Sequence, residues 1–118
     1  GNYDAAMALL SSVDPVNAFQ GEQHILEYYY RTGRIYHAKE HPEKALQYYR
    51  MAIERGKEKK WYFAASAAYQ SGLIFESRHE MSNAAMFYRM CLSMPVEEYR
   101  ASLRQKAKTG LVRVKANG

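Results

Sequence analysis

The stretch YRTGRIY, residues 30–36, recurs as YQSGLIF at residues 69–75 and more loosely as AKTGLVR at residues 107–113. The glycines at the centre of the three segments, Gly33, Gly72 and Gly110, return with a period of about 39 residues. A glycine inside a helix costs about 1 kcal/mol relative to alanine. A glycine that returns at a fixed period in helix-like sequence therefore indicates a place where two helices approach closely.

A second block repeats at the same period. KALQYYRMAI, residues 44–53, recurs as NAAMFYRMCL at residues 83–92, and AAMALLSSV at residues 5–13 is a more diverged copy. One small residue returns at equal intervals in the three copies: Ala6, Ala45 and Ala84. Two motifs that alternate at one period predict a two-helix unit stacked on copies of itself.

The rest of the sequence supports an all-α fold. The segments between the three prolines lack long β-branched alternation. Asp14-Pro15, His41-Pro42 and Pro95 indicate helix starts, because proline fits the first helical position, and Arg55-Gly56 indicates a stop. We expect about six helices, at residues 3–13, 20–39, 42–55, 59–78, 81–93 and 96–116.

The two blocks together resemble the tetratricopeptide repeat, whose pattern is W-x2-L-G-x2-Y, then A-x3-F, then P. The first helix of the unit is matched by Gly33-x2-Tyr36 and Gly72-x2-Phe75, and the second by Ala45-x3-Tyr49 and Ala84-x3-Tyr88. The period is longer than the family's period of about 34 residues. The family's Trp and Leu are replaced by Tyr29 and Thr32 in one copy and by Ala68 and Ser71 in the next.

This resemblance implies a right-handed superhelical array of antiparallel helix pairs that forms a single domain over residues 1–118. Residues 1–14 are expected to be the second helix of a preceding repeat, residues 20–56 and 59–94 two full repeats, and residues 96–118 a final first-type helix. We expect the chain to be a piece of a longer protein.

The repeated residues are expected to pack between helices rather than to bind ligands. These structural positions are Gly33, Tyr36, Ala45, Tyr49, Gly72, Phe75, Ala84, Tyr88 and Gly110. Cys91 takes the place of Ala52 in the previous copy, which predicts a small core residue. Of the three consecutive tyrosines, Tyr29 is expected to face the paired helix, Tyr30 the groove, and Tyr28 the neighbouring repeat or an edge.

In a stacked array of this kind the first helices line the concave side, where a peptide or a partner helix can bind. The spacing from the glycines places twelve residues in this groove: Glu27, Tyr30, Arg31, Arg34, His37, Ser66, Tyr69, Gln70, Leu73, Glu76, Arg104 and Lys108. The asparagines of the family's carboxylate-clamp members are missing. Arg31, Arg34 and Lys108 nevertheless favour an acidic partner.

No metal, cofactor or catalytic site is expected. HAKEH, residues 37–41, spells an H-x-x-E-H zinc signature, but the repeat places His41 in a turn before Pro42, away from the helical face of His37. The sequence has no glycine-rich phosphate loop and no G-x-S-x-G elbow, and its one cysteine has no partner for a disulfide. These features exclude the common enzyme signatures, so we expect a protein without catalytic activity.

The formal net charge of +5 suits an acidic partner. Lys57, Lys59, Lys60 and Trp61 form a basic and aromatic patch, yet acids are interleaved with the bases elsewhere, as in ERGKEKK. A nucleic-acid binder concentrates its bases on one face, so nucleic acid is disfavoured. No apolar run is long enough to span a bilayer, and no signal peptide is recognisable, which leaves the compartment unknown.

The sequence therefore predicts a protein-interaction scaffold that binds a peptide or protein partner in the groove. The alternatives are a basic helical-repeat module that binds RNA or another polyanion, and a self-association domain. The last rests on the open ends of the array, where Leu103, Leu111, Val112 and Val114 are expected to offer apolar surface for a homodimer.

Overall fold

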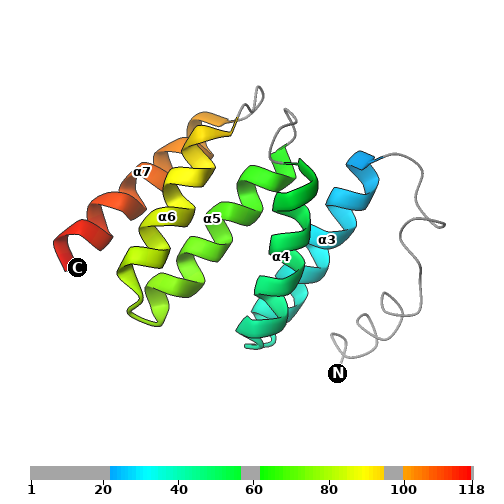
Figure 1. The fold of residues 1–118 in the computed structure, drawn as a ribbon, viewed down its shortest axis with the longest axis horizontal. Helices are drawn as coiled ribbons and strands as arrows, with labels where there is room; N and C mark the ends of the chain where they lie inside the picture. Colours follow the sequence, from blue (N-terminus) through cyan, green and yellow to red (C-terminus); the bar gives the residue numbers. More distant parts are fainter. Residues whose placement is uncertain (1–21, 57–61, 95–99, 118) are drawn as a thin grey trace.

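The computed structural model describes residues 22–56, 62–94 and 100–117, and the helices are the only regular elements there. They are α3 Glu22–Ala38, α4 Pro42–Gly56, α5 Tyr62–Ser77, α6 Met81–Ser93 and α7 Arg100–Asn117 (Figure 1). The all-α prediction is confirmed for these residues, and the five expected helices from residue 20 onward match them closely. The expected helix at residues 3–13 and the patch at residues 57–61 lie outside the described residues.

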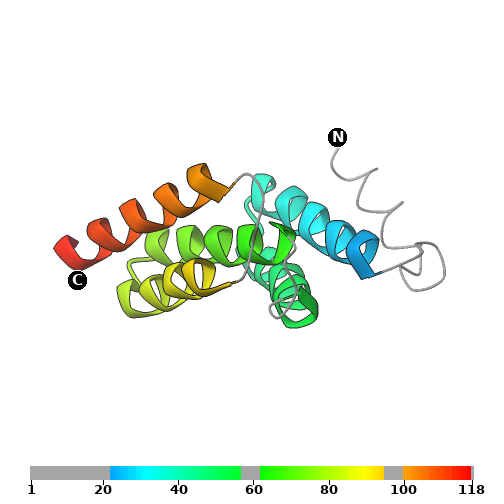
Figure 2. The same cartoon turned by 90° about the horizontal axis from the view of Figure 1, so that it is seen from above.

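The helices pack in chain order as antiparallel pairs. Each helix contacts the next, and α3 and α7 both also contact α5, whereas α4 and α6 do not contact each other. Seen from above, α4 and α6 lie on one side of α5, and α3 and α7 lie on the other (Figure 2). Helix α5 is therefore the centre of the described structure and separates two faces.

The central helix is packed from several sides, and its small residues make this possible. Ala64, Ala65, Ala67 and Ala68 are all fully buried in the main hydrophobic core. Gly56 at the end of α4 belongs to the same contact, because a Cβ there would lie 2.8 Å from the Cβ of Ala64. Small side chains let helix axes approach, and the neighbouring large side chains fill the remaining space.

The repeated glycines make room for tyrosine rings. A Cβ at Gly33 would lie 2.7 Å from the ring of Tyr49, and one at Gly72 would lie 2.6 Å from the ring of Tyr88. Gly110 faces the opposite edge of Tyr88, where a Cβ would lie 2.7 Å from the ring. The expected close approach at these glycines is thus a contact with a buried phenol ring, and not a contact with the opposite backbone.

Helices α3 and α5 end in the same way. Glu40 and His79 occupy equivalent positions in successive repeats, and both have left-handed backbone angles, with φ of 62° and 60°. The N–H of the following residue donates to a carbonyl five residues earlier in both places: His41 to Tyr36 and Glu80 to Phe75, each over 2.9 Å. These are the bonds of a Schellman motif, which satisfies the last carbonyls of a helix.

The three consecutive tyrosines point in three directions. The ring of Tyr29 lies 6.4 Å from that of Tyr48 in α4, so it faces the paired helix as predicted. The ring of Tyr30 lies 5.5 Å from that of Phe63 in α5. Tyr28 is buried, and its ring meets that of Tyr29 edge to face.

The HAKEH histidines do not share a helix. α3 ends at Ala38, so His41 lies in the turn, and His37 bonds through Nδ1 to the hydroxyl of Tyr49 at 3.1 Å. In the described ranges no three metal-ligating side chains gather. None of the helices found there has the length and apolar character that crossing a membrane requires.

Candidate functional site

A small hollow lies where α3, α5 and α7 meet, and we call it the α3/α5/α7 hollow. Its volume is about 120 Å³. Nine described residues line it: Tyr30, Arg34, Tyr62, Ser66, Tyr69, Gln70, Ser102, Leu103 and Lys106. Five of the twelve groove residues expected from the sequence therefore line this hollow, two from α3 and three from α5.

A hydrogen-bonded tyrosine joins α3 to α5 in this hollow. The hydroxyl of Tyr30 accepts from Ser66 Oγ over 2.8 Å and from Arg34 Nη1 over 3.1 Å. Ser66 is only 2% exposed, so its hydroxyl is held inside the contact between the two helices. The hydrogen bond that Arg34 donates to Tyr30 also raises the pKa of Arg34, which remains charged.

The charge of the hollow has one sign. Arg34 comes from α3 and Lys106 from α7, and both are exposed. None of the described residues that line the hollow is acidic. Two cations that line one hollow suit an anionic group of a ligand, and Tyr30, Tyr62 and Tyr69 add aromatic surface.

Glu76, another expected groove residue, is held by α6 and α7. Its carboxylate accepts from the Tyr88 hydroxyl over 2.6 Å and from Arg113 Nε and Nη2 over 2.8 and 3.0 Å. The hydrogen bonds from Arg113 lower the pKa of Glu76 despite its burial, and they raise the pKa of Arg113. These bonds tie three helices together, so the carboxylate is not free for a partner.

His37 takes the same place one repeat earlier, but none of the residues that the structure describes forms an ion pair with it. It bonds to Tyr49 as Glu76 bonds to Tyr88, and burial, helped by nearby Arg34, lowers the pKa of His37. The imidazole is therefore neutral near neutral pH.

The remaining groove residues lie outside the hollow. Glu27 and Arg31 form an exposed ion pair at 2.6 Å within α3. Leu73 packs against a second, smaller cluster of buried residues, which consists of Ala84, Ala85, Tyr88 and Val114. Arg104 donates to the Leu92 carbonyl of α6 over 2.9 Å, and Lys108 is exposed. A binding role for any of these residues stays a prediction.

Four lining residues were missed by sequence reasoning: Tyr62, Ser102, Leu103 and Lys106. The reason is geometric. α3 lines the hollow with residues three before and one after Gly33, whereas α7 lines it with residues four, seven and eight before Gly110. Counting α7 from Gly110 in the register of α3 therefore selected Arg104 and Lys108 instead of Lys106.

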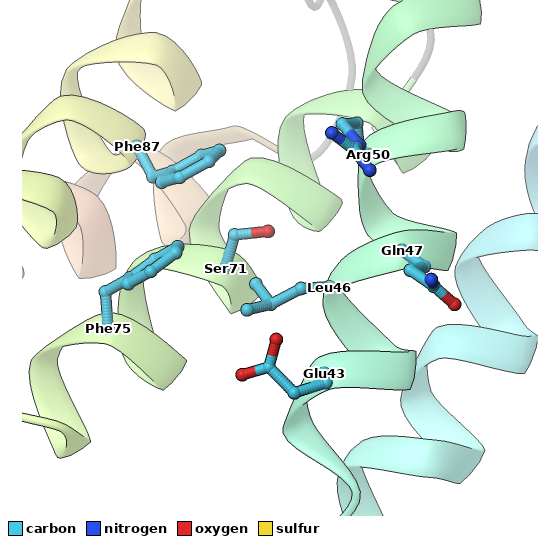
Figure 3. Close-up of a pocket in the computed structure, with 7 residues that line it drawn as sticks. All are labelled: Glu43, Leu46, Gln47, Arg50, Ser71, Phe75 and Phe87. Carbon is cyan, nitrogen blue, oxygen red and sulfur yellow. The ribbon is translucent and has the colours of Figure 1, made fainter.

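A larger hollow lies on the other face of α5, between α4 and α6, and we call it the α4/α5/α6 hollow. Its volume is about 340 Å³. The described residues that line it are Glu43, Leu46, Gln47, Arg50, Ser71, Phe75 and Phe87. In the close-up Leu46 points from α4 toward Ser71 and Phe75 of α5, and Phe87 of α6 forms the far wall (Figure 3). The sequence interpretation considered only the first helices and therefore missed it.

The sequence matches no protein-family model, and no curated protein is significantly similar to it.

Proposed function

We propose that this chain is a non-catalytic interaction scaffold that binds a peptide or protein partner on the face formed by α3, α5 and α7. The observation that carries this proposal is the α3/α5/α7 hollow, in which tyrosines and two cations converge from three helices. Aromatic and arginine side chains are the groups that most often anchor protein interfaces. The repeated motifs support a tetratricopeptide-like, right-handed superhelical array as the framework.

The hollow suits an acidic side chain or a terminal carboxylate of the partner. Arg34 and Lys106 supply the charge, and the bond from Ser66 holds the phenol of Tyr30 in place before a ligand arrives. Preorganised side chains lose less entropy on binding, which favours affinity.

The described nucleophile and base candidates support a protein without catalysis. Cys91 is buried, and desolvation raises the pKa of its thiol to about 11. His37 is committed to Tyr49. Neither group is presented to a substrate in an activated form.

One observation favours the polyanion alternative. Helix α7 carries six basic residues and no acid: Arg100, Arg104, Lys106, Lys108, Arg113 and Lys115. Arg113 is already paired with Glu76, and the other described bases of α7 point to more than one side, since Lys106 lines the hollow and Arg104 bonds to α6. This arrangement is less suited to a continuous phosphate backbone than to separate carboxylates.

The homodimer alternative has less apolar surface than the sequence predicted. Leu103 and Val114 are buried within the chain and Leu111 is half-buried, whereas Val112 is 69% exposed. One exposed valine does not make an interface of the size that a stable dimer needs.

The test is affinity capture from nuclease-treated lysate with the whole chain and two charge-reversed variants. Arg34→Glu combined with Lys106→Glu alters the α3/α5/α7 hollow, and Lys44→Glu, at an exposed lysine of α4 outside both hollows, is the control. A polypeptide that is retained by the parent and the control but lost by the double variant supports the proposal. Retention that depends on nucleic acid, or that is unchanged in the folded double variant, contradicts it.

A further inference from the structure

We propose that the α4/α5/α6 hollow is a second docking surface, and that its ligand is an acidic polypeptide segment that carries a large apolar side chain. This proposal does not depend on the groove of the first helices, because α5 separates the two faces (Figure 2).

The walls of the hollow suit an apolar side chain. The rings of Phe75 and Phe87 are stacked with their centres 5.4 Å apart and an angle of 6° between their planes. Leu46, half-buried, points toward them from α4 (Figure 3). The hydroxyl of Ser71 donates to the carbonyl of Ala67 over 2.9 Å, so it does not offer its proton to a ligand. A volume of about 340 Å³ admits a leucine or an aromatic side chain, which would lose its contact with water here.

The one acid among the described residues that line the hollow is already engaged by an arginine. Glu43 pairs with Arg78 at 2.8 Å, and Arg78 also lies 3.2 Å from Glu80 and over the ring of Phe75. Arg50 is exposed, and no ion pair to it occurs within the part of the chain that the structure describes. Arg50 is therefore the charged group of the rim that remains available for a carboxylate.

The same arrangement returns one repeat later. Ser82, Ala85 and Arg89 take the places of Glu43, Leu46 and Arg50 in the next copy. They line another hollow of about 260 Å³ together with Met81, Val114 and Lys115. Arg89 and Lys115 are exposed there, and neither has an ion-pair partner among the described residues.

Positive charge at a fixed repeat position, beside apolar walls, selects the chemistry of the ligand. An extended acidic segment places carboxylates and apolar side chains alternately, and so can meet both features. A nucleic-acid backbone carries a phosphate at every nucleotide and so could not avoid Glu43 in the same hollow, whereas a peptide can place an uncharged residue there. The structure therefore favours an acidic polypeptide.

The test uses a library of random twelve-residue peptides displayed on phage, selected on the whole chain. Peptides are then sorted by their binding to Arg50→Glu and to Arg34→Glu, the latter being the matched variant on the opposite face. The enriched sequences are synthesised with a fluorescent label and titrated by anisotropy, with poly-uridine RNA as a competitor. Circular dichroism checks that both variants are folded.

We expect a class of peptides that combine Asp or Glu with Leu, Phe or Trp. Their affinity should fall about tenfold or more in Arg50→Glu and stay unchanged in Arg34→Glu, and it should fall similarly when the apolar residue of the peptide is changed to alanine. The proposal is wrong if no enriched peptide is sensitive to Arg50→Glu, if the sensitive peptides lack acids or the apolar residue, or if the RNA displaces them at lower concentration than an acidic peptide does. A selection of peptides sensitive only to Arg34→Glu would overturn this proposal and leave the groove of the first helices intact.

Discussion

The phenol of Tyr88 donates a hydrogen bond to the carboxylate of Glu76 over 2.6 Å, and Tyr49 is bonded to His37 in the same relation one repeat earlier. The pairs differ in charge, and only the carboxylate recruits a cation from the next helix. That cation, Arg113, lies three residues after Gly110. In the two earlier copies the residue three after the glycine is aromatic, Phe75 and Tyr36. The last copy therefore has an ion pair between Arg113 and Glu76 at the position where the earlier copies have an aromatic side chain.

The Glu76 network should make stability depend on pH. The hydrogen bonds from Arg113 lower the pKa of Glu76 in the folded chain below its ordinary value of 4.5. The stabilisation is therefore present above the unfolded pKa and is lost as the pH falls through the folded pKa. Glu76→Gln should cost about 1–3 kcal/mol of unfolding free energy near neutral pH. This difference should shrink below about pH 4, as measured by urea unfolding across the range.

Glu40→Gln removes a carboxylate that is exposed, and it serves as the control. Its effect on unfolding should be small at all pH values. A Glu76→Gln penalty that stays constant down to acid pH would show that the carboxylate is not held in its charged form.

Gly72→Ala should destabilise the chain, because the added Cβ would lie 2.6 Å from the ring of Tyr88. That ring is fully buried and has Gly110 at its other edge, so it has no room to shift. Overpacking of this kind costs about 1–3 kcal/mol, which at least offsets the gain of about 1 kcal/mol from replacing a helical glycine and outweighs it over most of the range. Urea denaturation measures the difference.

The same substitution in a Tyr88→Leu background is the control. With the ring removed, Gly72→Ala should become neutral or favourable. Equal costs in the two backgrounds would mean that the tyrosine does not explain the repeated glycine.

Glu40→Gly and His79→Gly should each stabilise the chain. Both residues have a left-handed backbone, which costs an ordinary side chain roughly 1–2 kcal/mol and glycine almost nothing. Part of this gain is lost to the greater freedom of glycine in the unfolded chain, so we expect a net gain of about 0.5–1 kcal/mol. Thermal unfolding of the two variants gives the value, and Gln47→Gly within α4, which should lose about 1 kcal/mol, gives the contrast.

Cys91 should resist thiol reagents while the chain is folded. The side chain is 3% exposed, and desolvation raises the pKa of its thiol to about 11, so little reactive thiolate forms near neutral pH. Labelling with a disulfide reagent should be slow in buffer and rapid in guanidinium chloride. Rapid labelling of the native chain would show that α6 opens locally.

Several features of the fold could be predicted from the sequence because they depend on local spacing. The same number of residues separates Gly33 from Gly72 and Ala45 from Ala84, so the period can be read directly from the sequence. The prolines and glycines that bound the helices can be read in the same way. The positions of Tyr49 and Tyr88 as core residues followed from that period, and both are fully buried.

The tertiary structure alone decided how the helix faces meet. Which flank of α7 turns toward α5 depends on the packing of three helices, so Lys106 and Ser102 entered the hollow while Arg104 bonded to α6. The stacking of Phe75 on Phe87 and the bridge from Arg78 to Glu43 join residues of different helices, and no pattern within one helix encodes such contacts. A repeat period determines which residues are equivalent, whereas the shape and charge of a surface arise only where non-neighbouring side chains come together.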